Sequence, residues 1–315
     1  MQRFLLQRFL HMIFIVFIVT VLAFGILHII PGDPVLAILG DMVTQQQIDD
    51  LREELNLDKP LPQQYWLWVS GLVRGDFGRS ILYNEDVAGL IKARLPVSVH
   101  LSLAAFILAI VIGIPAGISS AMFHQRTADN LIIGFINLGM AVPIFWLAFI
   151  VIYFFALKLS WIPVQGYTSP FEDFALSLKQ ITMPILLLSL APVAIVARQT
   201  RSAMLDVLGQ SYIRTARSKG LKERNIIYRH AFKNAIIPVV TVIGLLARSL
   251  VGGSVLIETV FNIPGMGRLM VSAIFSRDFA IVQTILVIVG LTVSVANLLV
   301  DLSYGYLDPR IRIGG

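Results

Sequence analysis

Six stretches of this chain are apolar for long enough to cross a lipid bilayer, and no other feature constrains its fold as strongly. A transmembrane helix needs about 20 largely apolar residues, because each residue adds about 1.5 Å across a hydrocarbon core of about 30 Å. Counted between charged side chains, the stretches are 9–32, 95–125, 130–157, 180–197, 234–257 and 279–300. The fourth is short, and the fifth contains one charge, Arg248. We therefore predict an all-α membrane protein with six transmembrane helices.

The composition excludes two other classes of protein. Hydrophobic residues make up 57% of the chain and charged residues 14%, whereas soluble domains carry about 25% charged residues. Intrinsic disorder requires low hydrophobicity and high charge, so it is excluded as well. The chain has no cysteine, which rules out disulfides, thiolate metal sites and a cysteine nucleophile.

The distribution of Lys and Arg predicts the orientation in the membrane, because cytoplasmic loops are enriched in these residues. One side of the bundle carries thirteen of them, eight of which lie in the 201–234 loop. The short loops of the other side carry four, and the long 31–94 loop counts little in this rule. Both termini are therefore predicted to be cytoplasmic. The net charge of +6 reflects this asymmetry and does not require nucleic acid as a partner. Membrane lipids are the expected surroundings.

The predicted organisation has four parts. They are an N-terminal segment with the first transmembrane helix (1–30), a structured extracytoplasmic loop (31–94), a five-helix transmembrane core (95–303) and a cytoplasmic tail (304–315). The core contains the cytoplasmic loop 201–234.

The 31–94 loop shows signals for three helices. Thr44 with Gln47 forms a capping box, and Pro62 suits the first turn of a second helix. Asn84 is the expected cap of a third helix, with Lys92 and Arg94 late in it as the helix dipole prefers. Two interpretations stay open for this loop: helices that lie at the membrane interface, or a docking surface for another protein.

The 201–234 loop is the most informative segment. Residues 211–219 are predicted to form a short helix that Gly220 ends. A helix of nine residues is not stable alone in water, so its apolar residues Tyr212, Ile213 and Leu221 need a partner surface. A basic loop attracted to anionic lipid is the alternative.

This loop also resembles a known motif. Residues 212–221 and 229–238 resemble the EAA motif of permease subunits in binding-protein-dependent ABC importers. Further matches, to the B-type subunit of the dipeptide, oligopeptide and nickel branch, lie at 28–34, 55–61, 64–65, 75–79, 261–269 and 307–312. The glutamate of the motif falls on Arg214 and its first alanine on Thr215, which argues against a glutamate-based contact there.

The resemblance implies a fold like that of type I ABC importer permeases, in a bacterial cytoplasmic (inner) membrane. It implies that the short helix enters a cleft of a separate ATPase and transmits the ATP-driven closure of that ATPase to the bundle. The implied coupling residues are Tyr212, Ile213, Arg214, Thr215, Ala216, Arg217, Gly220 and Leu221. The implied substrate is a di- or oligopeptide, with nickel, free or chelated, as the alternative.

The resemblance also implies partner chains. They are a second permease of the C type, one or two kinds of cytoplasmic ATPase subunit and an extracytoplasmic substrate-binding protein. The chain has no Gly-x-x-x-x-Gly-Lys-Ser/Thr loop for ATP phosphates. We therefore expect a transport subunit that is not an enzyme and binds no cofactor or metal, with ATP and Mg on the partner ATPase.

Arg248 is the one charge expected in the middle of a span, and an Arg there costs about 2.5–3.5 kcal/mol on insertion scales. Gly244, Arg248 and Gly252 share one helical face by their spacing of four. This face either lines the translocation path, where Arg248 meets a substrate carboxylate, or pairs at an interface between permeases. Both interpretations stay open.

Two competing classes find little support. An intramembrane enzyme would need a recognisable site, and the chain has no His-Glu-x-x-His sequence, while its five histidines are scattered. A carrier that works alone often shows a repeat of broken helices, and the six stretches show no clear repeat.

Overall fold

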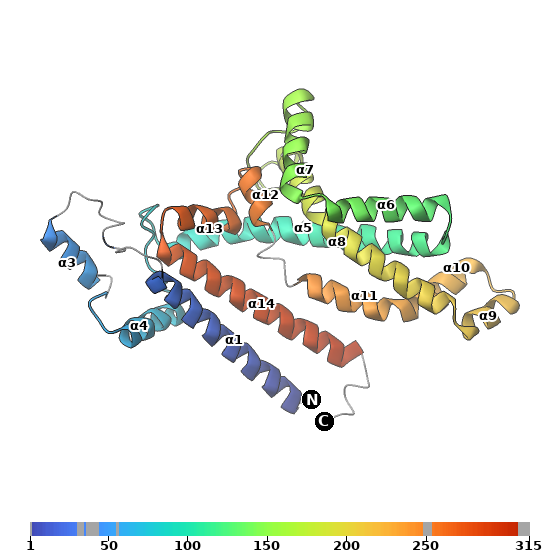
Figure 1. The fold of residues 1–315 in the computed structure, drawn as a ribbon, viewed down its shortest axis with the longest axis horizontal. Coiled ribbons are helices and arrows are strands. Elements are labelled where there is room, and N and C mark those ends of the chain that lie inside the picture. The colour runs from blue at the N-terminus through green and yellow to red at the C-terminus, as the bar shows by residue number, and fades with distance from the viewer. Residues whose placement is uncertain (1, 30–34, 36–43, 55–56, 248–253, 308–315) are drawn as a thin grey trace. The chain divides into compact units, whose positions relative to one another are not determined.

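A computed structural model describes residues 2–29, 35, 44–54, 57–247 and 254–307 (Figure 1). The described part of the chain contains helices and no β-strand. Five helices are long and apolar enough to cross a membrane, and a bent pair of helices makes a sixth candidate span. These spans match the six predicted from the sequence, so the all-α membrane fold is confirmed.

The chain divides into two compact units, which are described separately. One comprises Ser98–Pro264 and Ala296–Gly315, and the other comprises Gln2–Val97 and Gly265–Val295. Two long helices, α5 (Val87–Met122) and α14 (Phe279–Leu307), contribute residues to both units. The helices are α1 (Gln2–Ile29), α3 (Gln45–Glu54), α4 (Leu61–Arg74), α5 (Val87–Met122), α6 (Thr127–Ala141), α7 (Ile144–Val151), the π-helix η1 (Ile152–Lys158), α8 (Phe174–Leu208), α9 (Ser211–Ser218), α10 (Glu223–Asn225), the π-helix η2 (Ile226–Ala231), α11 (Phe232–Ala247), α12 (Val255–Val260), α13 (Met266–Phe275) and α14 (Phe279–Leu307).

In the unit that contains the N-terminal helices, the expected start signals of α3 and α4 are confirmed. The Gln47 amide nitrogen donates to Thr44 Oγ1 at 3.4 Å, and the Thr44 amide donates to Gln47 Oε1 at 3.0 Å, which is a reciprocal capping box. A proline lies in the first turn of α4. Trp68 packs against Phe24 of α1 with ring centroids 6.0 Å apart, whereas Trp66 is exposed. One of the two tryptophans therefore fixes α4 on α1.

The third helix of the 31–94 segment exists, but its predicted start at Asn84 and its predicted end near Arg94 are wrong. Asn84 has a φ of 53° and lies in a turn, where its carbonyl accepts a hydrogen bond from Arg79 Nη2 at 3.0 Å. The helix begins at Val87 and continues through Lys92 and Arg94 to the end of α5. The charges do not end the helix because Lys and Arg are good helix formers.

The start of α14 is fixed by Asp278, which is fully buried. Ser80 Oγ donates to its Oδ2 at 2.6 Å, and the Leu82 amide donates to the same oxygen at 3.0 Å. The Ile281 amide faces Oδ1 at 3.4 Å, as in an N-cap. A core formed by the first turns of α5, by α13 and by α14 lies next to these contacts.

In the other unit, α8 packs along α5, α6 and α11 (Figure 1). Two glycines four residues apart, Gly113 and Gly117 of α5, permit a close contact with α8. A Cβ added to Gly113 would lie 2.8 Å from Val196 Cβ, and one added to Gly117 would lie 2.5 Å from the Ala197 carbonyl oxygen. Only glycine permits this approach of α5 to α8.

The third predicted span is bent. α6 ends at Ala141, and α7 with η1 leaves it at an angle of 100°. Val142 is extended and Pro143 precedes the first residue of α7. Proline restricts the residue before it to extended conformations, which ends α6 at this point. A single straight helix over 130–157 is therefore wrong.

The fourth span is not short. α8 has 35 residues and passes through both charges that bounded the prediction, Lys179 and Arg198. Both side chains are exposed, so neither requires the helix to end. The first eight residues of the 201–234 segment are thus the end of α8, and its last part is α10, η2 and the start of α11.

Candidate functional site

The candidate site is built around α9, which lies between the end of α8 and α10. The predicted short helix is confirmed within a residue of its expected end. Gly220 has a φ of +73°, a left-handed conformation that suits glycine after a helix. Its amide donates to the Arg217 carbonyl at 2.9 Å and closes the last turn.

Two of the predicted coupling residues are buried inside this chain. Ile213 is 0% exposed and Ala216 is 8% exposed. Their core also contains Met204 of α8 and Ile226 and Ile227 of η2. The expectation that Ile213 and Ala216 contact a partner directly is therefore corrected, because these side chains pack α9 against α8 and η2.

The other predicted coupling residues are exposed, and they form the outer face of α9 and the turn after it. They are Tyr212, Arg214, Thr215, Arg217, Gly220 and Leu221. Leu221 is 41% exposed. We call these six residues the outer α9 face.

Polar contacts fix part of the outer α9 face. Asn234 Nδ2 of α11 donates to the Tyr212 hydroxyl at 2.8 Å. Arg217 Nε donates to Glu223 Oε1 of α10 at 2.8 Å, in an exposed ion pair. α9 is thus tied to α8, η2 and α11 by its buried side and to α10 and α11 by these bonds.

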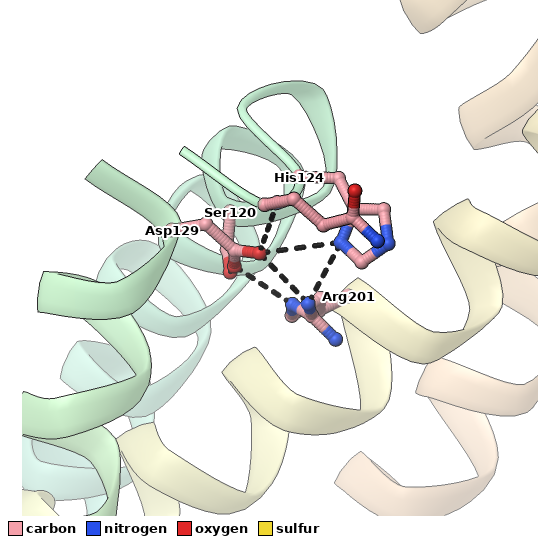
Figure 2. A network of polar contacts seen from close by, with 5 residues as sticks. Ser120, His124, Asp129 and Arg201 are labelled. Atoms are coloured by element: carbon pink, nitrogen blue, oxygen red, sulfur yellow. Dashed lines mark hydrogen bonds and ion pairs between the residues drawn. The ribbon is translucent and has the colours of Figure 1, made fainter. Parts of the chain in front are cut away.

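A buried ion pair joins Asp129 of α6 to Arg201 of α8 (Figure 2). Met204, which belongs to the core of α9, follows Arg201 by three residues. Asp129 is 1% exposed. Arg201 of α8 donates to it twice, from Nε to Oδ1 at 2.9 Å and from Nη2 to Oδ2 at 2.8 Å. Such a two-pronged contact fixes both distance and angle. A buried carboxylate is stable only when it is paired and hydrogen-bonded in this way.

Three further groups complete the surroundings of Asp129. Ser120 Oγ of α5 donates to Oδ1, and the Gln125 amide donates to Oδ2 at 3.0 Å. His124 Nδ1 lies 3.2 Å from Oδ2 and 3.0 Å from Arg201 Nη2. The sequence analysis missed this cluster, because its two charges lie 72 residues apart. The signal was an acid in the first turn of an apolar helix, at Asp129.

Glu258 of α12 is another buried acid that the sequence analysis missed. It is 0% exposed and accepts hydrogen bonds from Ser98 Oγ at 2.6 Å and from Ser254 Oγ at 2.5 Å. The contact ties the first part of α5 in this unit to α12. Among the described residues, no three His, Asp or Glu side chains gather as ligands for a metal ion.

Of the three residues predicted to line a translocation path, only Gly244 lies within the described residues. A Cβ added to it would lie 3.0 Å from Val300 Cγ1 of α14. Close packing of α11 on α14 accounts for this glycine. Arg248 and Gly252 lie outside the described residues, so their part in a path stays a prediction.

Comparisons with known protein families match nearly the whole chain. The family model for the inner membrane component of binding-protein-dependent transport systems matches residues 113–313. The model for the N-terminal part of such membrane components matches residues 1–104.

Relatives match over almost their entire lengths. A probable peptide ABC transporter permease protein of Sinorhizobium fredii is 41% identical over 312 residues, which cover 99% of this chain and 100% of the relative. A putative peptide transport system permease protein of Brucella abortus is 40% identical over 313 residues, with 99% of both chains covered. A dipeptide transport system permease protein of Alkalihalophilus pseudofirmus is 38% identical over 332 residues, with 99% and 100% covered.

One solved structure has a similar fold. It is the crystal structure of an amino acid ABC transporter with histidines, with a TM-score of 0.50 and 16% identity. The match covers 70% of this chain and 94% of that one. At this level of identity the likeness concerns the fold alone.

Proposed function

Since this chain belongs to the family of inner membrane components of binding-protein-dependent transport systems, we propose that it is the permease subunit of an ATP-driven importer of di- or oligopeptides. The observation that carries the substrate class is the match over whole chains to permeases named for peptides and dipeptides. These names favour a peptide over nickel. The several apolar helices make it a multi-pass membrane protein, and the family places it in a bacterial inner membrane.

The outer α9 face is the proposed contact with an ATPase subunit. Its exposed apolar residues, Tyr212 and Leu221, stand among the basic residues Arg214 and Arg217. The buried side of the same helix is fixed to α8, η2 and α11. A push on the outer α9 face therefore displaces α8 and α11 together, because packed side chains transmit movement with little compression. In this account ATP and Mg bind to the partner and this chain binds no cofactor.

The remaining partners are proposed from the family. They are a second permease subunit of the C type, one or two kinds of ATPase and an extracytoplasmic binding protein. The asymmetry of Lys and Arg supports cytoplasmic termini. With this orientation the 31–94 segment lies on the extracytoplasmic side, where it is available to dock a partner. Arg248 and Gly252 remain the proposed part of the translocation path, whereas Gly244 packs against Val300 of α14.

Reconstitution into liposomes tests this function. We expect the complete transporter to accumulate labelled dialanine only under one condition. ATP must be supplied on the cytoplasmic side of the membrane, and the binding protein on the extracytoplasmic side. The ATPase should co-purify with this chain, because α9 provides its docking surface. Liposomes that contain this chain alone should show no uptake. Peptide uptake by this chain alone, without ATP, would contradict the proposal.

A further inference from the structure

We propose that the buried ion pair of Asp129 and Arg201 is a positioning clamp, which makes the α5–α6 hairpin move as one body with α8 and α9 during transport. The inference rests on the proposed function, since it assumes that an ATPase displaces α9. It assigns a role in coupling to residues that contact neither the ATPase nor the substrate.

The ion pair lies where three helices meet. Asp129 lies in the first turn of α6, directly after the turn that joins α6 to α5. Ser120 of α5 binds the same carboxylate (Figure 2). The backbone amide of Gln125, in the turn, binds it as well. Arg201 belongs to α8, seven residues before this helix ends at Leu208. One carboxylate thus joins three helices close to the start of α9.

The stretch of α8 that contains Arg201 also packs against α9. Met204, three residues after Arg201, is 0% exposed and shares a core with Ile213 of α9. A Cβ added to Gly117 would lie 3.0 Å from the Arg201 amide nitrogen, so the α5 backbone is pressed against Arg201 itself. A displacement of α9 therefore reaches Arg201 through packed atoms.

The ion pair adds a directional contact to the apolar packing of these helices. Apolar contacts are non-directional, so packed helices can slide past one another. A two-pronged Arg–carboxylate contact holds a fixed geometry. It keeps the register of α6 against α8 while α9 moves. Because α6 is joined to α7 through the 100° bend, a displacement of α6 also moves α7 and η1.

Neutral replacements of similar shape provide the test. The complete transporter is assembled with the double variant Asp129→Asn/Arg201→Gln and supplied with labelled dialanine. We expect normal assembly and continued ATP hydrolysis, with the amount of peptide moved per ATP lowered about fivefold or more, as for a typical coupling between sites. The ratio of uptake to hydrolysis is the readout, because a purely structural role would lower both rates together.

The matched control is Arg198→Gln/Asp206→Asn. It makes the same two chemical changes on exposed positions of α8 and should leave the ratio unchanged. Arg201→Lys is the second variant. It keeps the charge that compensates buried Asp129 but loses the two-pronged geometry, so it should assemble and give an intermediate ratio.

The outcomes separate this inference from the proposed function. A wild-type transporter that moves no peptide would refute the function itself. If the wild type transports and both Asp129/Arg201 variants keep its ratio, the clamp is refuted and the function stands. Failure of both variants to assemble would also refute the clamp, because the ion pair would then serve folding alone.

Discussion

Replacing Gly220 with proline is expected to abolish peptide uptake while the chain still inserts into the membrane. Gly220 has a φ of +73°, and proline is fixed near −65°. Proline also lacks the amide hydrogen that bonds the Arg217 carbonyl. Each effect costs on the order of 1 kcal/mol or more. The end of α9 should unwind and move Leu221 away from its position on the outer α9 face.

The matched control is Gly220→Asn, since asparagine tolerates the left-handed conformation and keeps the amide. Uptake and ATPase co-purification should be close to the wild type in this variant and lost in Gly220→Pro. The amount of chain in the membrane fraction should be the same in both. If the proline variant transports at the wild-type rate, the assignment of α9 as the coupling helix is wrong.

Gly117→Leu is expected to destabilise the chain more than any other single substitution of a glycine in α5. The position where its Cβ would stand is 2.5 Å from the Ala197 carbonyl oxygen and 2.5 Å from Thr200 Cβ. Backbone atoms cannot rotate away as a side chain can, so α5 and α8 must separate. Overpacking of this kind costs about 1–3 kcal/mol or more. The Asp129–Arg201 contact should also lengthen, because Gly117 lies against Arg201.

The measurement is the fraction of monodisperse transporter that remains after heating in detergent. Gly134→Leu is the matched control, because a Cβ at Gly134 of α6 meets no atom within 4 Å. Its thermal stability should equal that of the wild type, whereas Gly117→Leu should aggregate at a lower temperature. Equal stability of the two variants would contradict the close packing of α5 on α8.

Local patterns in the sequence predicted the number of spans, the start of α3 and the helix α9. Each depends on residues that are neighbours in the chain, such as Thr44 with Gln47 or α9 with Gly220. The buried Ile213 and Ala216 were misread because a short helix shows its apolar side without showing what covers it. Met204 and the π-helix η2 cover these two side chains, and they lie outside the short segment from which the helix was predicted.

Charges were the main source of error. Treating each charged residue as the end of a span shortened α8 and separated Lys92 and Arg94 from α5. A charge can lie within a long helix when it is exposed at one end or paired, as Arg201 is with Asp129. That pairing joins residues 72 positions apart, and the contact of Ser98 with Glu258 joins residues 160 positions apart. No local periodicity reports contacts of that kind.

The central claim is that this chain is an essential part of a peptide importer. The most direct test is uptake by cells that carry the complete transporter, compared with cells that lack only this chain. Labelled dialanine, labelled pentaalanine and nickel are offered in parallel. We predict that deletion abolishes peptide uptake, that restoring this chain restores it, and that nickel uptake is unchanged. Loss of nickel uptake with peptide uptake intact would contradict the claim.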